Sequence, residues 1–434
     1  MLTKFTLANF KSYRNATLDL SPLTLLIGAN ASGKSNALEA MQMLSWLSRG
    51  RRLEDVFQAV QESELLMRGT VADLAFGGTG NFRLGCVMEP QTWNKLEVEM
   101  SAGSDGMRIV QERIEGPINN PPLYQVSRST KGFSHDLLVS YNNFARGRNK
   151  PQMTCTDQQA VFTQMLTPAS FAAGHKLSQE VIPGVAKTFV QALEHILFLD
   201  PMPRQMRDYS FVMDKVLKGN GSNLSSTLYD LCETQKIKDK VLEFVRDLPE
   251  QDITDIQFLE GPRKEVMVKL EETFGGTRQY REAAVLSDGT LRVIAVAAAL
   301  LSAHEGSMVV VEEIDNGVHP SRARTLLANI ERVAREKKLV VVLTSHNPAL
   351  LDALPPSAIP DAVFCYRDPQ QGDSRLVRLS QLPDYPELVA QGPLGRLVTQ
   401  GILDRFVKNA KPPGEKLHAT LAWIEDLEKK AALP

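Results

Sequence analysis

Cysteine is scarce in this 434-residue chain, and the few cysteines lie far apart. The four are Cys86, Cys155, Cys232 and Cys365, with no Cys-x-x-Cys pair among them. This usage is typical of a reducing cytosol and argues against a structural zinc site. The seven histidines form no cluster with the spacing of metal ligands. We therefore expect a cytoplasmic protein without structural zinc.

Long hydrophobic runs are also missing. The first residues, Met-Leu-Thr-Lys-Phe-Thr, lack the apolar core of a signal peptide. The most apolar run, residues 293–301, is too short to cross a bilayer. No heptad pattern is long enough for a coiled coil, and no repeat or low-complexity segment occurs. These absences exclude a membrane protein and a clamp with long coiled-coil arms.

Charge of one sign is not in excess, because the formal net charge is only −2. The chain as a whole is therefore not attracted to nucleic acid or to anionic membranes, although a local basic patch is compatible with this balance. A hydrophobic content of 43% and a charged content of 23% are ordinary for a globular protein. The length predicts two lobes or domains.

The most informative segment that is present runs from Gly28 to Ser35 and fits the pattern G-x-x-x-x-G-K-[S/T]. Glycines allow backbone N–H groups to close around an anion, Lys34 can reach the β- and γ-phosphates, and the Ser35 hydroxyl can bind Mg²⁺. Residues 23–27 predict a buried strand before the loop, and apolar residues at helical spacing predict a helix after it. The expected nucleotide-binding residues are Gly28, Asn30, Ala31, Ser32, Gly33, Lys34, Ser35 and Asn36.

Four regions are predicted along the chain. Residues 1–150 form the first part of an ATPase lobe with an antiparallel β element, and residues 151–280 form a mostly helical inserted lobe. Residues 281–408 form the second part of the ATPase lobe, and residues 409–434 form a tail helix. Continuous apolar strands alternating with helices in the last third predict an α/β fold around a mixed, mainly parallel sheet. Two finer predictions are a strand over residues 70–76 and a helix over residues 185–199.

Two acidic residues, Glu312 and Glu313, end the apolar run of residues 309–311. In a phosphate-loop enzyme, one carboxylate at such a strand end holds Mg²⁺ through its water shell, and its neighbour activates the attacking water. Glu312 suits the metal role and Glu313 the role of the base. The alternative is a pair of solvated acids at the end of a strand.

Two further motifs accompany the acidic strand. Ser287, Asp288 and Gly289 precede an Ala-rich helix, where they form either an anion site or an ordinary N-cap. His346 follows the apolar strand of residues 339–343, and a residue at that end of a doubly wound sheet points into the ligand crevice. His346 could contact a γ-phosphate there, and the alternative is an ordinary loop histidine.

As a set, these motifs resemble those of ABC-type ATPases, in their order along the chain. Three segments are similar to sequences of the RecF/SMC/OLD branch. They are Asn-Phe-Lys-Ser-Tyr at positions 9–13, Gly-Ala-Asn at 28–30 and Glu-Glu-Ile-Asp-Asn-Gly-Val-His-Pro at 312–320. That branch works on chromosomes, DNA repair and anti-phage defence. The resemblance covers the nucleotide-binding lobe, whereas residues 150–280 carry no motif that we can place.

The resemblance implies a homodimer in which two subunits pair head to tail and enclose two ATP molecules with Mg²⁺. Lys34 and Ser35 of one subunit would share an ATP with the Ser287–Gly289 signature of the other. Glu313 would be the base, Glu312 the metal-side carboxylate and His346 the γ-phosphate sensor. Further residues implied in the site are Lys11 and Ser12 at the nucleotide, and His319 in the loop that contacts the other subunit.

The sequence departs from the family pattern at three positions. Glu312 stands where many ABC-type chains have Asp, and Asp288 stands where transporters have Gly. The glutamine that usually senses Mg²⁺ has no clear counterpart, and only their proximity makes Gln58 and Gln61 candidates.

Three functions remain open at this point. The first is an ATPase sensor or scaffold of an anti-phage system that controls a nuclease or toxin effector in trans. It is favoured because fewer than a hundred residues follow His346, too few for the Toprim nuclease domain of OLD proteins. The second is a RecF-like repair ATPase that closes on DNA directly. The third is an ATP-stabilised binding module with negligible turnover, which would not need Glu313.

Overall fold

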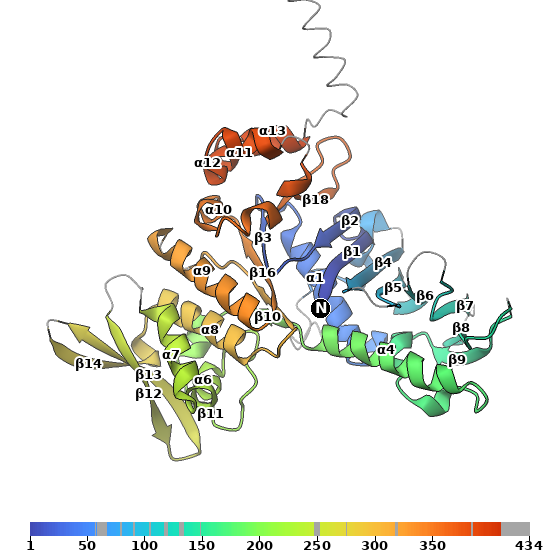
Figure 1. The fold of residues 1–434 in the computed structure, drawn as a ribbon, viewed down its shortest axis with the longest axis horizontal. Helices are drawn as coiled ribbons and strands as arrows, with labels where there is room; N and C mark the ends of the chain where they lie inside the picture. Colours follow the sequence, from blue (N-terminus) through green and yellow to red (C-terminus); the bar gives the residue numbers. More distant parts are fainter. Residues whose placement is uncertain are drawn as a thin grey trace, which may run out of the picture.

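The computed structural model describes residues 1–56, 58, 67–78, 80–89, 92–103, 106–116, 120–129, 134–147, 149–246, 252–274, 276–316, 320–382 and 385–408. These residues form three sheets and the helices that cover them (Figure 1). The expected α/β architecture, with a mainly parallel sheet and an antiparallel β element, is confirmed.

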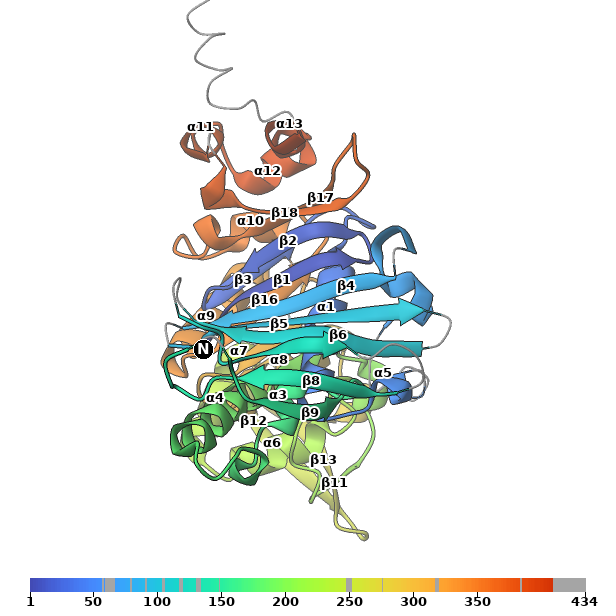
Figure 2. The same ribbon diagram turned by 90° about the vertical axis from the view of Figure 1, so that its right-hand side faces the viewer.

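The antiparallel element is an eight-stranded sheet with the order β2-β1-β4-β5-β6-β7-β8-β9. It lies on the right in Figure 1, and its strands face the viewer in Figure 2. Its central strands alternate buried and partly exposed residues, because only one face packs on the core. That core also contains the long helices α1 and α4. The elements are β1 (Leu2–Phe10), β2 (Tyr13–Asp19), β4 (Asn81–Met88), β5 (Lys95–Gly103), β6 (Gly106–Glu115), β7 (Tyr124–Ser129), β8 (Asp136–Tyr141), β9 (Gln152–Thr156), α1 (Lys34–Ser48), α3 (Val161–Gln164) and α4 (Lys176–Glu194).

The second sheet has the order β10-β15-β16-β3-β17-β18 and is parallel except for its last strand. Its central strands are buried throughout because both faces are covered. Val310 and Val342 face the core shared with α1, whereas Val309 and Val341 face a second core with α8 and α9. This explains the continuous apolar runs in the sequence. The elements are β3 (Leu23–Ile27), β10 (Leu197–Leu199), β15 (Met308–Val311), β16 (Val340–Ser345), β17 (Val363–Arg367), β18 (Ser374–Arg378), α8 (Asp288–Ser302) and α9 (Pro320–Glu336).

A third sheet and a group of short helices complete the fold. The sheet joins β11, β13 and β12 in that order, with β14 paired to β13, and α6 and α7 pack between it and α8. After the parallel sheet, helices α10 to α13 lie beyond its β17–β18 end (Figure 1). The elements are α5 (Pro203–Met206), β11 (Ser210–Phe211), α6 (Leu224–Cys232), α7 (Gln235–Val245), β12 (Ile253–Gly261), β13 (Glu265–Phe274), β14 (Thr277–Glu282), α10 (Ala349–Ala353), α11 (Tyr385–Ala390), α12 (Leu394–Thr399) and α13 (Ile402–Lys408).

The strand expected at residues 70–76 is wrong, because two 3-10 turns, Val71–Leu74 and Phe76–Gly78, occupy this segment. The Asp73 carboxylate accepts a hydrogen bond from the Thr70 backbone N–H at 2.7 Å, and such a local cap favours a turn over an extended strand.

The helix expected at residues 185–199 ends early, at Glu194, and Leu197–Leu199 instead forms β10. Pairing with β15 in the parallel sheet overrides helical propensity there. Segment 151–280 therefore contributes strands to each of the sheets around its helices. The tail helix predicted for residues 409–434 lies outside the described residues.

A buried carboxyl group lies in the core of the antiparallel element. Glu112 in β6 is 1% exposed and accepts hydrogen bonds from the Tyr124 hydroxyl at 2.5 Å and from the Val161 and Phe162 N–H groups at 2.7 Å. Burial raises the pKa of Glu112 from 4.5 to about 7 in spite of these donors. The folded protein therefore keeps this proton to a higher pH than the unfolded chain does.

We expect Glu112→Gln to flatten part of the pH dependence of stability. A raised carboxyl pKa makes the free energy of unfolding fall as pH rises through the interval from 4.5 to about 7. The substitution should remove up to about 3 kcal/mol of this fall. Urea unfolding between about pH 5 and about pH 8 measures it. Glu115→Gln, on the same strand, is the matched control and should keep the wild-type slope, and an unchanged slope in Glu112→Gln would contradict the assignment.

Candidate functional site

The phosphate loop spans residues 28–33, between the end of β3 and the start of α1. Two of its glycines are required by the surrounding atoms. A Cβ on Gly28 would lie 2.1 Å from the Cys365 carbonyl oxygen, and Gly33 has φ +119° with the Ser374 hydroxyl 2.5 Å from the place of a Cβ. Neighbouring β17 and β18 therefore hold the loop from behind, and only glycine allows that approach.

Gly28→Ala is expected to disrupt the loop. The clash is with a backbone carbonyl, so neither partner can move aside without displacing β3 or β17. We expect ATP affinity to fall by at least about tenfold and the unfolding midpoint to decrease. Nucleotide titration and thermal unfolding measure the two effects. Gly174→Ala, where a Cβ meets nothing within 4 Å, is the matched control, and equal behaviour of both variants would refute the packing argument.

Two polar side chains, of Lys34 and Ser32, belong to the phosphate loop and its junction with α1. The Lys34 ammonium donates hydrogen bonds to the Gly28 carbonyl at 2.6 Å and the Ala29 carbonyl at 3.0 Å. Partial burial lowers the pKa of Lys34, while the nearby charges of Glu313 and Asp315 oppose that shift. The Ser32 hydroxyl is buried and has no hydrogen-bond partner among the described residues. A cation and an unsatisfied hydroxyl on one glycine-rich loop fit a nucleotide phosphate.

Lys11 and Ser12 support the loop from the turn between β1 and β2. The Lys11 ammonium forms an ion pair with Glu39 of α1 and donates a hydrogen bond to the Arg68 carbonyl at 2.7 Å. The Ser12 hydroxyl accepts hydrogen bonds from Asn36 at 2.7 Å and from Ser374 at 2.8 Å. In this geometry these side chains position α1, and the expected direct contact of Lys11 with nucleotide would require it to leave Glu39.

The acidic pair lies where β15 ends, beside the loop. The Glu313 N–H donates to the Thr344 hydroxyl at 2.9 Å, and Glu313 has a left-handed φ of +48°. Such strain in a residue other than glycine is concentrated at functional sites. Burial raises the pKa of Glu312 to about 7, and the negative charge of Asp200 contributes. The Glu313 side chain is exposed and the Glu312 side chain is half-buried.

Asp200 and Arg68 are two members of this cluster that sequence reasoning missed. Asp200 follows β10, whose pairing with β15 places it next to Glu312, and burial raises its pKa. The positive charge of Arg68 opposes the rise in the pKa of Glu312 that burial causes. An apolar run ended by an acid, Leu-Phe-Leu-Asp at 197–200, was a usable signal for Asp200, since it repeats the pattern of residues 309–312. Arg68 carries no comparable signal.

His346 and the phosphate loop share a cavity of about 420 Å³. The cavity is lined by loop residues 28–32, by His346 and, on its far side, by Asp404 and Lys408 of α13. His346 Nδ1 lies 3.7 Å from a carboxylate oxygen of Asp315, whose other oxygen is buried without a hydrogen-bond partner among the described residues. The structure thus brings His346 to the loop, as the sequence analysis expected from strand order.

The signature residues lie at the start of α8 and do not line the cavity at the phosphate loop. The Ser287 hydroxyl accepts a hydrogen bond from the Thr290 N–H at 3.1 Å and so caps the helix. Asp288 is exposed and pairs with Arg207 at 2.6 Å, while Gly289 is partly buried. The N-cap interpretation of Ser287 is therefore correct for the single chain.

The remaining expected residues are His319 and the two glutamine candidates. His319 and Gln61 lie outside the described residues, and Gln58 is exposed. Within the described part of the chain, no group of three or more His, Cys, Asp or Glu side chains is arranged to hold a metal ion by itself. Over the same residues, no helix has the length and apolar character needed to span a membrane.

Fold and site together define a P-loop nucleotide-binding protein of the ABC type. Residues 107–352, more than half of the chain, match the family described as "AAA domain, putative AbiEii toxin, Type IV TA system", and residues 1–67 match an "AAA ATPase domain". The chain belongs to this family of AAA domains and is an ABC-type P-loop ATPase of the RecF/SMC/OLD-like branch.

Curated relatives share parts of this chain. A DNA replication and repair protein RecF from Gloeobacter violaceus is 45% identical over 64 residues, which are 14% of this chain and 15% of that protein. A DNA double-strand break repair Rad50 ATPase from Methanococcus maripaludis is 23% identical over 279 residues, 63% of this chain and 24% of that protein. The matched regions thus span less than a quarter of the length of each of these relatives.

Solved SMC head structures are also similar in outline. The SMC head domain from Thermotoga maritima has 13% identity and a TM-score of 0.41, covering 87% of this chain and 98% of that one. An SmcHead bound to the C-winged helix domain of ScpA has 12% identity and a TM-score of 0.48, covering 87% and 97% of the two chains.

Proposed function

We propose that this protein hydrolyses ATP in a head-to-tail homodimer. The observation that supports it most is the gathering of Lys34, Glu313, Asp315 and His346 around one loop, while the signature at Ser287 lies apart from that loop. An ATP on the loop would then be covered by the signature of a second copy. Dimer closure would depend on ATP, and hydrolysis would reopen the dimer.

The residues present fit a Mg²⁺–ATP ligand. Ser35 is the second residue of α1, and Glu312 and Asp200 directly follow the adjacent strands β15 and β10, so hydroxyl and carboxylate oxygens lie at the same end of the sheet. Mg²⁺, when bound there by Ser35 and Glu312, would neutralise charge on the phosphates. Lys34 would bind the phosphates, Glu313 would accept a proton from the attacking water, and His346 would contact the γ-phosphate.

The biological role that we favour is a sensor or scaffold of an anti-phage system, with a nuclease or toxin effector in trans. The family description, which names an AbiEii toxin and a type IV toxin–antitoxin system, supports this choice. In this role, the closed dimer would hold the effector and the open dimer would release it. A phage-derived trigger would change the balance between the closed and open states.

A pull-down tests the role. Tagged Glu313→Gln protein, expressed with its native neighbouring genes, is isolated with ATP and Mg²⁺, and Lys34→Ala protein is the matched control that cannot close on ATP. A nuclease-like or toxin-like chain that is captured only by Glu313→Gln and released on infection is the expected result. Protection of cells by this protein alone, with nothing captured, would overturn the proposal.

DNA repair is the second candidate, because the RecF and Rad50 relatives carry that function in their names. The protein would then bind DNA directly, in an ATP-dependent way and with a steep dependence on salt. Binding of duplex DNA by Glu313→Gln at low salt, lost in Lys34→Ala, would favour this role. The absence of any DNA binding at low salt would remove it.

A non-catalytic module that uses ATP as a structural ligand is the third candidate. The strained, exposed Glu313 disfavours it, because a protein that only binds ATP does not need a base at that position. The module would be favoured over the ATPase if wild type showed no turnover with any partner, or if Glu313→Gln left turnover unchanged.

A further inference from the structure

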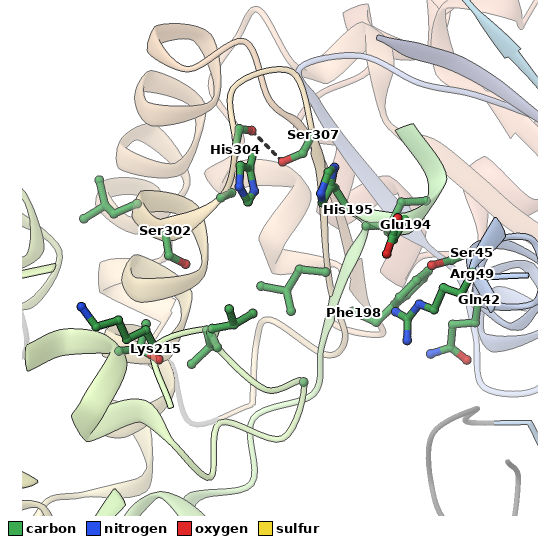
Figure 3. Close-up of a pocket in the computed structure, with 18 of the residues that line it drawn as sticks. Gln42, Ser45, Arg49, Glu194, His195, Phe198, Lys215, Ser302, His304 and Ser307 are labelled. Atoms are coloured by element: carbon green, nitrogen blue, oxygen red, sulfur yellow. Dashed lines mark hydrogen bonds between the residues drawn. The ribbon is translucent and has the colours of Figure 1, made fainter. Parts of the chain in front are cut away.

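A second cavity, of about 610 Å³, lies at the N-terminal ends of β10 and β15 (Figure 3), whereas the phosphate loop follows the C-terminal end of β3. Its walls include the last turns of α1, the end of α4, and the connection from α8 to β15. Ser45 is eleven residues after Lys34, so it lies about 16 Å further along α1. The cavity is therefore separate from the nucleotide site described above.

The cavity lies where the two hydrophobic cores meet. Trp46 and Ile196 on its walls belong to the core of the antiparallel element, whereas Leu217 and Leu301 belong to the core around α8 and α9. A molecule bound there would touch both cores. Its size is in the range that small organic ligands occupy in proteins.

Three polar groups on the α1 wall have no hydrogen-bond partner in the described part of the chain. They are Gln42 Oε1, Ser45 Oγ and Trp46 Nε1. Their side chains belong to residues that are only 6%, 2% and 3% exposed. Buried polar groups are normally satisfied, so three such groups within five residues of one helix call for a partner. Together they supply an acceptor, a hydroxyl and an N–H donor.

The mouth of the cavity carries aromatic and basic groups. The His195 and His304 rings, which come from the end of α4 and from the connection between α8 and β15, stack at 4.8 Å between centroids, and Figure 3 shows them next to each other. Arg49, at the end of α1, forms no ion pair among the described residues and stands on the same wall as Gln42. Lys215, across the cavity, pairs with Asp230, and Glu194 is the remaining acid on the wall.

We propose that this cavity binds a nucleoside monophosphate as a second, non-catalytic ligand. The hydrogen-bonding groups of Gln42, Ser45 and Trp46 match the donors and acceptors on the edge of a nucleobase. Arg49 and the two imidazoles suit the phosphate, which needs cationic and N–H donors at the open end. Such a ligand would join the two cores through α1, the helix that begins at the phosphate loop.

The test isolates this site by using Lys34→Ala protein, in which the phosphate loop no longer holds nucleotide. AMP, GMP, CMP and UMP are titrated separately and followed by calorimetry and by tryptophan fluorescence. We expect at least one of them to bind with a dissociation constant below about 1 mM. Adding Ser45→Ala or Arg49→Ala should weaken this binding by about tenfold or more.

A matched pair of tryptophan variants reports where the ligand sits. Trp46→Phe keeps an aromatic ring but removes the N–H, so it should weaken binding and abolish the fluorescence change. Trp93→Phe is the same change elsewhere, at a residue whose N–H already bonds to the Pro121 carbonyl, and it should leave both unchanged. Absence of binding by all four nucleotides to folded Lys34→Ala protein would overturn the proposal. Binding that is unchanged by substitution of Ser45, Trp46 and Arg49 would also overturn the proposal. Neither outcome bears on ATP hydrolysis, because Lys34→Ala is used throughout.

Discussion

Lys34→Ala protein is expected to bind ATP at least about a hundredfold more weakly than wild type. The Lys34 ammonium is held at the phosphate loop by two backbone carbonyls of that loop, and its positive charge faces Glu313 and Asp315. Its loss removes the charge-assisted hydrogen bonds to phosphate and leaves these acids uncompensated. Calorimetric titration with ATP and Mg²⁺ measures the change.

Lys187→Ala serves as the control, because Lys187 is exposed on α4 and does not line the cavity at the phosphate loop. It should bind ATP as wild type does. If correctly folded Lys34→Ala retained most of its affinity, Lys34 would not contact the phosphates and the site would have to be reassigned.

Glu313→Gln should keep ATP affinity and lose turnover by about a hundredfold to ten-thousandfold, the usual effect of removing a general base. The amide cannot accept the proton of the attacking water, but the size of the side chain and its left-handed backbone are unchanged. Because ATP is then not hydrolysed and the closed dimer does not reopen, the variant should be dimeric with ATP and Mg²⁺. Phosphate release and light scattering after size exclusion measure the two effects.

Glu305→Gln is a suitable comparison, since Glu305 is exposed and pairs only with Lys338 among the described residues. It should hydrolyse ATP at the wild-type rate and, with ATP and Mg²⁺, show the same oligomeric state as wild type. A monomeric Glu313→Gln protein in saturating ATP would be incompatible with the head-to-tail dimer.

The regular parts of the site could be predicted because their signals are local. A phosphate loop needs glycine, lysine and serine at fixed spacing, and the order of apolar strands is enough to bring His346 to it. The parallel sheet was likewise predictable, since each of its central strands is buried on both faces and reads as an apolar run.

The remaining parts depend on contacts between distant segments. β10 is only three residues long and is separated from the end of α4 by two residues, so the position of Asp200 beside Glu312 is evident only once β10 is paired with β15. Lys11 was expected at the nucleotide, but its ion pair with Glu39 is set by how the β1–β2 turn meets α1. The ion pair of Arg68 with Glu39, at 2.9 Å, likewise depends on the contact of two segments that are distant in the sequence.

The position of β3 in its sheet limits how this chain can be divided. β3 comes from the first tenth of the sequence, yet it lies between β16 and β17, which come from the last quarter. A fragment ending near residue 150 would leave β3 without either neighbour and expose its apolar side chains to water. The complementary fragment would have a gap in the middle of its sheet. The two stretches therefore form one folding unit, and a truncation meant to isolate the phosphate loop would instead yield an insoluble polypeptide.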